Sequence, residues 1–152
     1  MRKEKVIENI LWSIALPGFA QLLNKRYLKG FFFIGLEFLI NIQANFNEAI
    51  FLSFHGRIQE AIEVTNFQWL MFYPCLYFFA MWDACRDSGV KVPLFTYLPF
   101  VFSAYFVTVG LILSPEVKVF GKLLGPVWLP MLFVIPGVTI GFVLKKILSN
   151  FT

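Results

Sequence analysis

The sequence predicts an all-α, polytopic membrane protein: a bundle of four spanning helices preceded by a short N-terminal helix that re-enters the membrane or lies at its interface. The composition indicates this class. Of the 152 residues, 59% are hydrophobic and 14% are charged, with a mean hydropathy of +0.73, whereas a soluble domain carries about 25% charged residues. The chain also has 20 phenylalanines, too many for a core of this size to bury, so we expect lipid to solvate many of them.

The length allows one membrane domain over residues 1–152, with four or five apolar segments. Four of these segments are expected to span the membrane: residues 31–54, 67–82, 94–113 and 128–144. The stretches between them are polar enough to be loops or interfacial pieces. One of these stretches, residues 115–125, alternates lysines with apolar residues in a way that predicts a short helix on the outer interface.

The first apolar stretch, residues 10–23, has only fourteen positions, fewer than the roughly 20 that a spanning helix needs. It contains Pro17 and Gly18, which together weaken a continuous helix and permit a turn. It is not read as a signal peptide, because Glu8 and Asn9 precede it closely and no small-x-small cleavage site follows. We predict that this stretch dips into the membrane and returns, with a full crossing as the alternative.

The distribution of basic residues favours the dip, because Lys and Arg accumulate in cytoplasmic loops. If both ends of residues 10–23 are cytoplasmic, the outer side holds only Arg57, Lys118 and Lys122 of the 13 basic residues. A full crossing with the C-terminus still inside places seven basic residues inside and six outside, which is no bias. The dip therefore places both termini in the cytoplasm. The ten basic residues it places inside are Arg2, Lys3, Lys5, Lys25, Arg26, Lys29, Arg86, Lys91, Lys145 and Lys146.

Two motifs carry a family resemblance. The run PGFAQLLNKRYLKG resembles the Pro-Gly-x-Gly-Gln-x-Tyr-Asn entry of small TM2-like bacterial membrane proteins, and WDACRDSG resembles their Asp-Ala-Tyr-Arg close. The sequence departs from the family at Ala20, Leu23 and Cys85. The resemblance covers residues 1–90, and residues 91–152 would add two further transmembrane helices. It implies a helical hairpin module in the bacterial cytoplasmic membrane, mostly without an assigned chemistry. The matching residues are Pro17, Gly18, Gln21, Asn24, Gly30, Asp83, Ala84 and Arg86.

A carboxylate lies inside the second apolar segment. On a helix with 100° per residue, Glu37 shares a polar stripe with Asn41, Asn45 and Glu48. An intramembrane carboxylate is costly and by default faces protein or a water-filled cavity with a partner. The stripe is interpreted either as a hydrogen-bonded contact between helices, with Glu37 protonated or paired to a cation such as Arg26, or as a functional site. The functional site would be a path for cations or protons, or a polar cavity that binds a headgroup.

A second carboxylate, Asp83, ends the third segment. We expect it to pair with Arg86, or with Lys25 or Arg26 across the loop, and so to fasten the re-entrant turn to the third helix. This cytoplasmic-rim motif comprises Pro17, Gly18, Gln21, Asn24, Arg26, Asp83 and Arg86. A catalytic role is not favoured, because the single histidine, His55, is expected on the opposite side of the membrane.

The remaining patterns concern packing and exclusions. Gly137 and Gly141 have the Gly-x-x-x-Gly spacing of a close helix–helix contact. We predict no catalytic residues, no metal site and no cofactor, because the chain has no His/Cys cluster, phosphate loop or nucleophile elbow. Nucleic acid is not an expected partner, since the net charge of +4 forms no basic stripe and reflects membrane orientation.

The predicted function is therefore a non-enzymatic integral membrane protein that acts by binding, as a scaffold or accessory subunit. Its expected partners are the lipid bilayer and other membrane proteins, or a second copy of itself. The alternative is a small transporter or channel component that uses Glu37 and its polar stripe. A lipid enzyme is a third interpretation, which lacks a catalytic pair.

Overall fold

The computed structural model describes residues 2–151, with side chains from Glu4 onward, and its secondary structure is helical apart from one two-stranded hairpin. The predicted all-α class is therefore confirmed. The elements in chain order are α1 (Arg2–Ala15), α2 (Phe19–Leu23), α3 (Tyr27–Ala44), α4 (Phe46–Phe54), α5 (Ile58–Val64), α6 (Phe67–Leu70), α7 (Phe72–Arg86), α8 (Leu98–Leu113), β1 (Lys118–Val119), β2 (Lys122–Leu123) and α9 (Gly125–Ser149).

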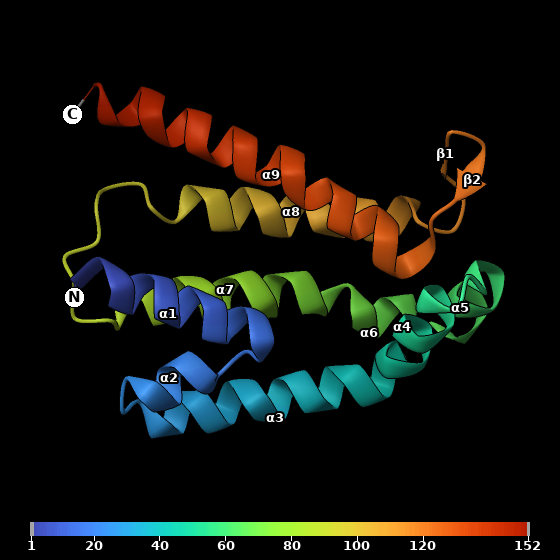
Figure 1. Cartoon of the computed structure of the whole chain (residues 1–152), viewed down its shortest axis with the longest axis horizontal. Coiled ribbons are helices and arrows are strands. Elements are labelled where there is room, and N and C mark those ends of the chain that lie inside the picture. The colour runs from blue at the N-terminus through green and yellow to red at the C-terminus, as the bar shows by residue number, and fades with distance from the viewer. Residues whose placement is uncertain (1, 152) are drawn as a thin grey trace.

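The long helices lie side by side and alternate in direction (Figure 1). Helices α3 and α8 run away from the end of the bundle where α1 begins and α9 ends, which we call the terminal end. Helices α7 and α9 run back from the opposite end, which carries β1 and β2 and which we call the hairpin end. Helix α7 lies between α3 and α8, and α1 also packs against it.

Helices α1 and α2 form a short helical hairpin. Helix α1 runs into the bundle from the terminal end, and α2 returns to that end before α3 begins (Figure 1). The chain reverses at Pro17 and Gly18, and Gly18 has a φ of +105°, a conformation that glycine adopts without steric cost. The turn predicted from this Pro-Gly pair is therefore present.

The predicted segment 31–54 is not one helix. Asn45 has a φ of 53° and ends α3, and α4 starts at the next residue. Asn tolerates this left-handed conformation better than most residues. Its Nδ2 donates to the carbonyl oxygen of Val64 in α5 at 3.0 Å, which holds the bend against another element. The chain therefore bends between α3 and α4.

The predicted interfacial helix over residues 115–125 is wrong. Strands β1 and β2 pair antiparallel there, with Lys118 opposite Leu123 and Val119 opposite Lys122. The two turn residues, Phe120 and Gly121, have φ values of 49° and 78°. Two consecutive positive φ values match the twist of a tight β-hairpin, so the Phe-Gly pair rather than the helical period determines the local structure.

Of the four predicted spanning helices, one meets the requirement by length and composition. Within residues 2–151, α9 is the helix that is long and apolar enough to cross a membrane, and α8 is a shorter apolar helix. Lys29, Glu37 and Asn41 make α3 more polar, and α7 and α8 have only 15 and 16 residues.

Helices α8 and α9 approach each other closely at glycines. A Cβ atom added to Gly137 would lie 2.7 Å from the Cα of Ser103, and one added to Gly141 would lie 2.4 Å from the Cα of Pro99. Gly110 of α8 has a similar position, since its Cβ would lie 2.9 Å from the Cα of Pro130. The Gly-x-x-x-Gly pair thus lies in the α8–α9 contact, where the absence of side chains lets the backbones meet.

Candidate functional site

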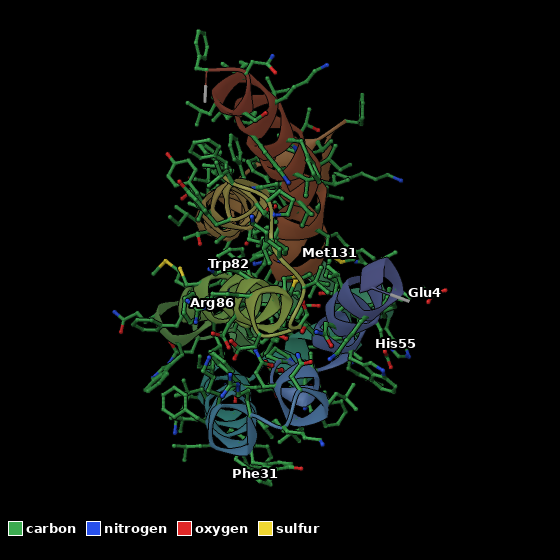
Figure 2. All side chains as sticks on the ribbon, turned by 90° about the vertical axis from the view of Figure 1, so that its left-hand side faces the viewer. Glu4, Phe31, His55, Trp82, Arg86 and Met131 are labelled. Carbon is green, nitrogen blue, oxygen red and sulfur yellow. The ribbon has the colours of Figure 1, made fainter. Side chains whose placement is uncertain are left out.

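A group of polar side chains from α1, α2, α3 and their loops meets the last turns of α7 at the terminal end of the bundle. Figure 2 views the molecule from this end, with Arg86 labelled on α7. We call this group the polar cluster. Its members are Asn9, Gln21, Asn24, Arg26, Lys29, Asp83, Arg86 and Asp87.

Asp83 is the centre of the polar cluster. It is buried, and its carboxylate accepts hydrogen bonds from Lys29 Nζ at 2.9 Å, Arg86 Nη2 at 2.7 Å and Gln21 Nε2 at 3.4 Å. A buried carboxylate is costly unless it is paired and hydrogen-bonded. These donors come from α2, α3 and α7, so the charge of Asp83 holds three elements together.

Lys29 connects two carboxylates. Its Nζ lies 2.9 Å from Asp83 Oδ1 and 2.7 Å from Asp87 Oδ2, and Arg26 Nε lies 3.7 Å from the same Asp87 oxygen. The hydrogen bonds to Asp87 and Asp83 raise the pKa of Lys29 above its ordinary value of 10.5. Lys29 therefore stays charged at neutral pH.

Amide side chains donate hydrogen bonds to carbonyl groups in the last turns of α7. The last four carbonyl groups of a helix lack partners within that helix, and the carbonyl oxygen of Ala84 accepts from Asn9 Nδ2 at 3.1 Å and Asn24 Nδ2 at 3.4 Å. Gln21 Nε2 donates to the carbonyl oxygen of Ala80, one turn before these terminal carbonyl groups, at 2.8 Å. Asn9 and Gln21 are almost completely buried. The α1–α2 hairpin is thus bonded to α7 through side chains on both of its arms.

The polar cluster differs in its partners from the expected rim motif. Asp83 does pair with Arg86, but its partner across the loop is Lys29 rather than Lys25 or Arg26. Arg26 instead approaches Asp87. Asn9, Lys29 and Asp87 are members that the sequence did not predict. Asn9 directly precedes the apolar stretch 10–23, and Lys29 lies one helical turn after Arg26, and both positions are signals that could have included them.

Two glycines of the predicted entry motif lie against each other. Gly18 and Gly30 are both buried, and a Cβ on Gly18 would lie 2.5 Å from the carbonyl oxygen of Gly30. The neighbouring Pro17 is fully buried. These residues act through backbone packing and bring α2 close enough to α3 for Gln21 and Lys29 to reach the same carboxylate.

Glu37 forms a separate polar site in the interior of the bundle. It is 9% exposed, and its Oε1 accepts a hydrogen bond from the Tyr73 hydroxyl of α7 at 3.1 Å. Its other oxygen, Oε2, has no hydrogen-bond partner among the described residues. Of the two alternatives for Glu37, protonation or pairing with a cation such as Arg26, the pairing with Arg26 is not formed, because Arg26 lies in the polar cluster.

The predicted polar stripe does not continue from Glu37 to Glu48. Because the chain leaves the helical path at Asn45, positions beyond Ala44 no longer follow a rotation of 100° per residue. Glu48 is exposed on α4, and Asn41 Nδ2 bonds to Asn47 Oδ1 at 3.2 Å on the surface. Glu37 is therefore the only member of the stripe that is buried within the described residues.

Residues with the potential for metal or nucleophile chemistry are dispersed. In the described part of the chain, no three His, Cys, Asp or Glu side chains lie close enough together to hold a metal ion. His55 is exposed, and its Nδ1 lies 2.8 Å from the carbonyl oxygen of Phe51. Cys75 is exposed and Cys85 is buried, and neither forms a disulfide.

Comparison of the chain with protein-family models, with curated proteins and with solved structures finds no match. The resemblance to TM2-like membrane proteins therefore stays a prediction from the two motifs.

Proposed function

We propose that this protein is a non-enzymatic, multi-pass membrane protein that acts by binding, as a scaffold or accessory subunit. Its surface supports placement in lipid, because large apolar side chains are exposed on several helices. Phe31 and Phe38 of α3 are 66% and 68% exposed, Tyr105 of α8 is 63% exposed and Ile135 of α9 is 64% exposed. A soluble protein rarely exposes apolar side chains over so much of its surface.

Some of the proposed membrane spans consist of two helices that are separated by a bend. Helix α9 has 25 residues, which at a rise of about 1.5 Å per residue gives about 37 Å, more than the roughly 30 Å of a bilayer core. The other spans are the part of α3 from Phe31 together with α4, the pair α6–α7, and α8. Asn45 is exposed, but the backbone at this bend has partners within the protein, because the carbonyl oxygen of Ala44 accepts from the backbone N–H of Asn66 at 3.1 Å.

The charge at the two ends supports one orientation. The terminal end carries Lys25, Arg26, Lys29, Arg86, Lys91, Lys145 and Lys146. The hairpin end carries Arg57, which directly precedes α5, and Lys118 and Lys122 of the two strands. Because basic residues accumulate on the cytoplasmic side, the terminal end is cytoplasmic in this proposal. Both termini are then cytoplasmic, and the membrane is the bacterial cytoplasmic membrane.

The observation that carries the proposal is the bonding of the α1–α2 hairpin to α7. The hairpin enters and leaves at the same end of the bundle, and Asn9 and Gln21 donate to the carbonyl oxygens of Ala84 and Ala80. The charges of Asp83 and Asp87 are paired within the chain. This arrangement supports a rigid re-entrant element that presents a fixed cytoplasmic surface to other membrane proteins or to a second copy of the chain.

Cysteine labelling tests the topology. In a background with Cys75→Ala and Cys85→Ala, single cysteines replace Lys5, Lys91 and Glu63, which are exposed. We expect a membrane-impermeant maleimide to label positions 5 and 91 only from the cytoplasmic side, and position 63 only from outside. Labelling of position 5 from outside while position 91 reacts from inside would show that the first segment crosses, and would contradict the re-entrant arrangement.

A second candidate function is a transporter or channel component built around Glu37. The unpartnered Oε2 of this buried side chain favours it, because a carboxylate without a full set of partners in an apolar interior often marks an ion or proton path. The opposing observation is the position of the nearest polar groups. Tyr73 bonds to Glu37 and Tyr77 bonds to the carbonyl oxygen of Ile14, so neither hydroxyl continues a chain of donors and acceptors to the hairpin end.

A further inference from the structure

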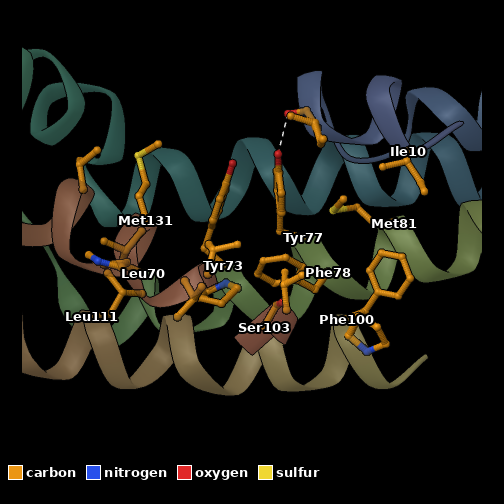
Figure 3. A pocket seen from close by; sticks show the side chains of 18 of the residues that line it. Ile10, Leu70, Tyr73, Tyr77, Phe78, Met81, Phe100, Ser103, Leu111 and Met131 are labelled. Atoms are coloured by element: carbon orange, nitrogen blue, oxygen red, sulfur yellow. Dashed lines mark hydrogen bonds between the residues drawn. The ribbon is translucent and has the colours of Figure 1, made fainter. Parts of the chain in front are cut away.

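A long apolar cleft runs between α1, α4, α7, α8 and α9. It has a volume of about 760 Å³, within the range of about 300–1,000 Å³ that is typical of ligand sites. Figure 3 shows its interior, where Ile10 of α1 and Met81 of α7 lie near one end and Leu70 and Leu111 near the other. The polar cluster and Glu37 do not line it.

The walls of the cleft present almost no hydrogen-bonding groups. Tyr73 and Tyr77 line it with their rings, and their hydroxyl groups point away from it, toward Glu37 of α3 and the carbonyl oxygen of Ile14 (Figure 3). Ser103 Oγ is a buried hydroxyl without a partner among the described residues. An occupant of this cleft must therefore be mainly hydrocarbon.

The cleft extends along the side of the bundle where α1 and α9 lie. Seen from the terminal end, α1 and α9 lie on the same side of α7 and α8 (Figure 2), and all four helices contribute to the lining. Met131 and Phe142 of α9 line the cleft and are 56% and 55% exposed. In the proposed orientation this side faces the acyl chains of the bilayer.

The terminal end of the cleft carries a positive charge. Lys145 lines it, and its Nζ donates to Thr96 Oγ1 at 2.9 Å. None of the residues that line the cleft is acidic, and Lys145 forms no ion pair within the described residues. A cation without a carboxylate at the end of an apolar cleft is complementary to an amphiphile with an anionic headgroup.

The charge at the terminal end of the cleft favours an anionic lipid over a partner helix. An acyl chain matches the hydrocarbon lining, and a phosphate headgroup gives Lys145 the anionic partner that no lining residue supplies.

We propose that this cleft binds one acyl chain of an anionic phospholipid from the cytoplasmic leaflet, with the phosphate of its headgroup at Lys145. This inference rests on the proposed placement of the protein in a membrane. It names a lipid as a specific partner of the scaffold, held between the re-entrant helix α1 and helix α9, so that the lipid bridges the two halves of the bundle.

Native mass spectrometry of the full-length protein in detergent tests the headgroup. Phosphatidylglycerol and phosphatidylcholine with the same acyl chains are titrated separately, and the fraction of protein that retains one lipid is measured. We expect phosphatidylglycerol to be retained about fivefold more tightly, the preference that one basic side chain gives for an anionic lipid. Lys145→Gln should remove this preference, whereas Lys146→Gln, at the exposed neighbouring position outside the cleft, should keep it.

A second pair of variants tests the cleft itself. Val138 lines the cleft, and Ile135 lies on the exposed face of the same helix. Val138→Trp should abolish retention of both lipids, and Ile135→Trp should leave it unchanged. Equal retention of the two lipids by the native protein, or full retention by a folded Val138→Trp variant, would overturn the inference. The inference would also be overturned if the native protein is a dimer and Val138→Trp dissociates it, because the cleft would then be a contact between two copies of the chain.

Photo-crosslinking of the native protein gives a measurement that needs no variant to fold. Phosphatidylglycerol with a diazirine in one acyl chain is incorporated into phosphatidylcholine vesicles that contain the protein. We expect cross-links at Val134 and Val138, which line the cleft, and few at Phe38 on the outer face of α3. A uniform distribution over the exposed helices would overturn the inference. Because cysteine labelling reports topology independently, a failure of lipid binding is distinguishable from a failure of the proposed function.

Discussion

The Lys29 ammonium lies 2.9 Å from the Asp83 carboxylate, and this pair joins the first turn of α3 to the last turn of α7. The Asp83 side chain is 3% exposed, whereas that of Lys29 is 39% exposed. Loss of the pair therefore has different consequences for the two side chains. Lys29 can be solvated by water, but Asp83 depends on donors from the protein.

Replacement of Lys29 by alanine should destabilise the fold. Lys29→Ala removes a charge-assisted hydrogen bond from a buried carboxylate, and we expect the free energy of unfolding to fall by about 1–3 kcal/mol. Lys91→Ala removes an exposed lysine in the α7–α8 loop and should change it by less than about 0.5 kcal/mol. Equilibrium unfolding in mixed detergent micelles, followed by circular dichroism, measures both values.

A double-mutant cycle separates this pair from the rest of the polar cluster. Lys29→Ala should cost less in an Asp83→Asn background, because the buried charge that Lys29 neutralises is then absent. We expect an interaction free energy of at least about 0.5 kcal/mol, the lower end for residues in contact. If the two losses simply add, Lys29 acts through Asp87 and does not fasten α3 to Asp83.

Titration of Lys29 should change the stability of the fold only at alkaline pH. Hydrogen bonds to Asp87 and Asp83 raise the pKa of Lys29 above 10.5. A group whose pKa is raised in the folded state contributes fully below its unfolded-state pKa, and this contribution is lost as the pH rises through the folded-state value.

The Lys29→Arg variant isolates this titration, because a guanidinium stays charged at all accessible pH values. The difference in unfolding free energy between native protein and Lys29→Arg should be constant below pH 10.5. Above that pH it should shift in favour of the arginine variant. A difference that already changes near neutral pH would contradict the assignment of the alkaline loss to Lys29.

The Gly18–Gly30 contact should tolerate no side chain at Gly18. Gly18 has a φ of +105°, and its Cβ would lie 2.5 Å from the carbonyl oxygen of Gly30. The backbone strain from the positive φ and the steric overlap of the added Cβ with Gly30 both disfavour alanine. We therefore expect Gly18→Ala to destabilise the fold by about 1–3 kcal/mol. Gly35→Ala is the control, because no atom lies within 4 Å of its added Cβ. Thermal unfolding should show a loss at position 18 and none at position 35; equal losses would contradict the close contact.

The sequence predicted those features that depend on local chemistry. The turn at Pro17 and Gly18 could be predicted because proline and glycine restrict or free the backbone wherever they occur. The pairing of Asp83 with Arg86 followed from their separation by one helical turn. In both cases the interacting atoms lie within a few residues of each other, so no knowledge of the tertiary fold was needed.

The features that the sequence did not predict depend on a single backbone angle or on distant packing. The left-handed conformation of Asn45 ends α3 and moves Glu48 to the surface, and positive φ values at Phe120 and Gly121 give a hairpin in place of a helix. Lys29 meets Asp83 because Gly18 and Gly30 let α2 and α3 approach. Helical periodicity contains none of this information, because it assumes that every residue continues the same helix.

The scaffold and transport functions make different predictions for Glu37. Its Oε1 accepts a hydrogen bond from the Tyr73 hydroxyl at 3.1 Å. Glu37→Gln keeps the size of the side chain and an oxygen acceptor for Tyr73 but removes the titration. In the scaffold function we expect Glu37→Gln to fold with near-native stability, and Glu37→Leu to lose about 1–3 kcal/mol because the Tyr73 hydroxyl is left without a partner in the interior.

Flux measurements on reconstituted vesicles complete this test. We expect no proton or cation flux above that of empty vesicles for the native protein, measured with a pH-sensitive dye under an imposed potential. Tyr73→Phe provides a matched control, because it removes the hydrogen bond but leaves the carboxylate of Glu37 in place. If the native protein instead shows a pH-dependent flux that Glu37→Gln abolishes while Tyr73→Phe retains it, the carboxylate carries the ion, and the protein acts as a transporter or channel component rather than a scaffold.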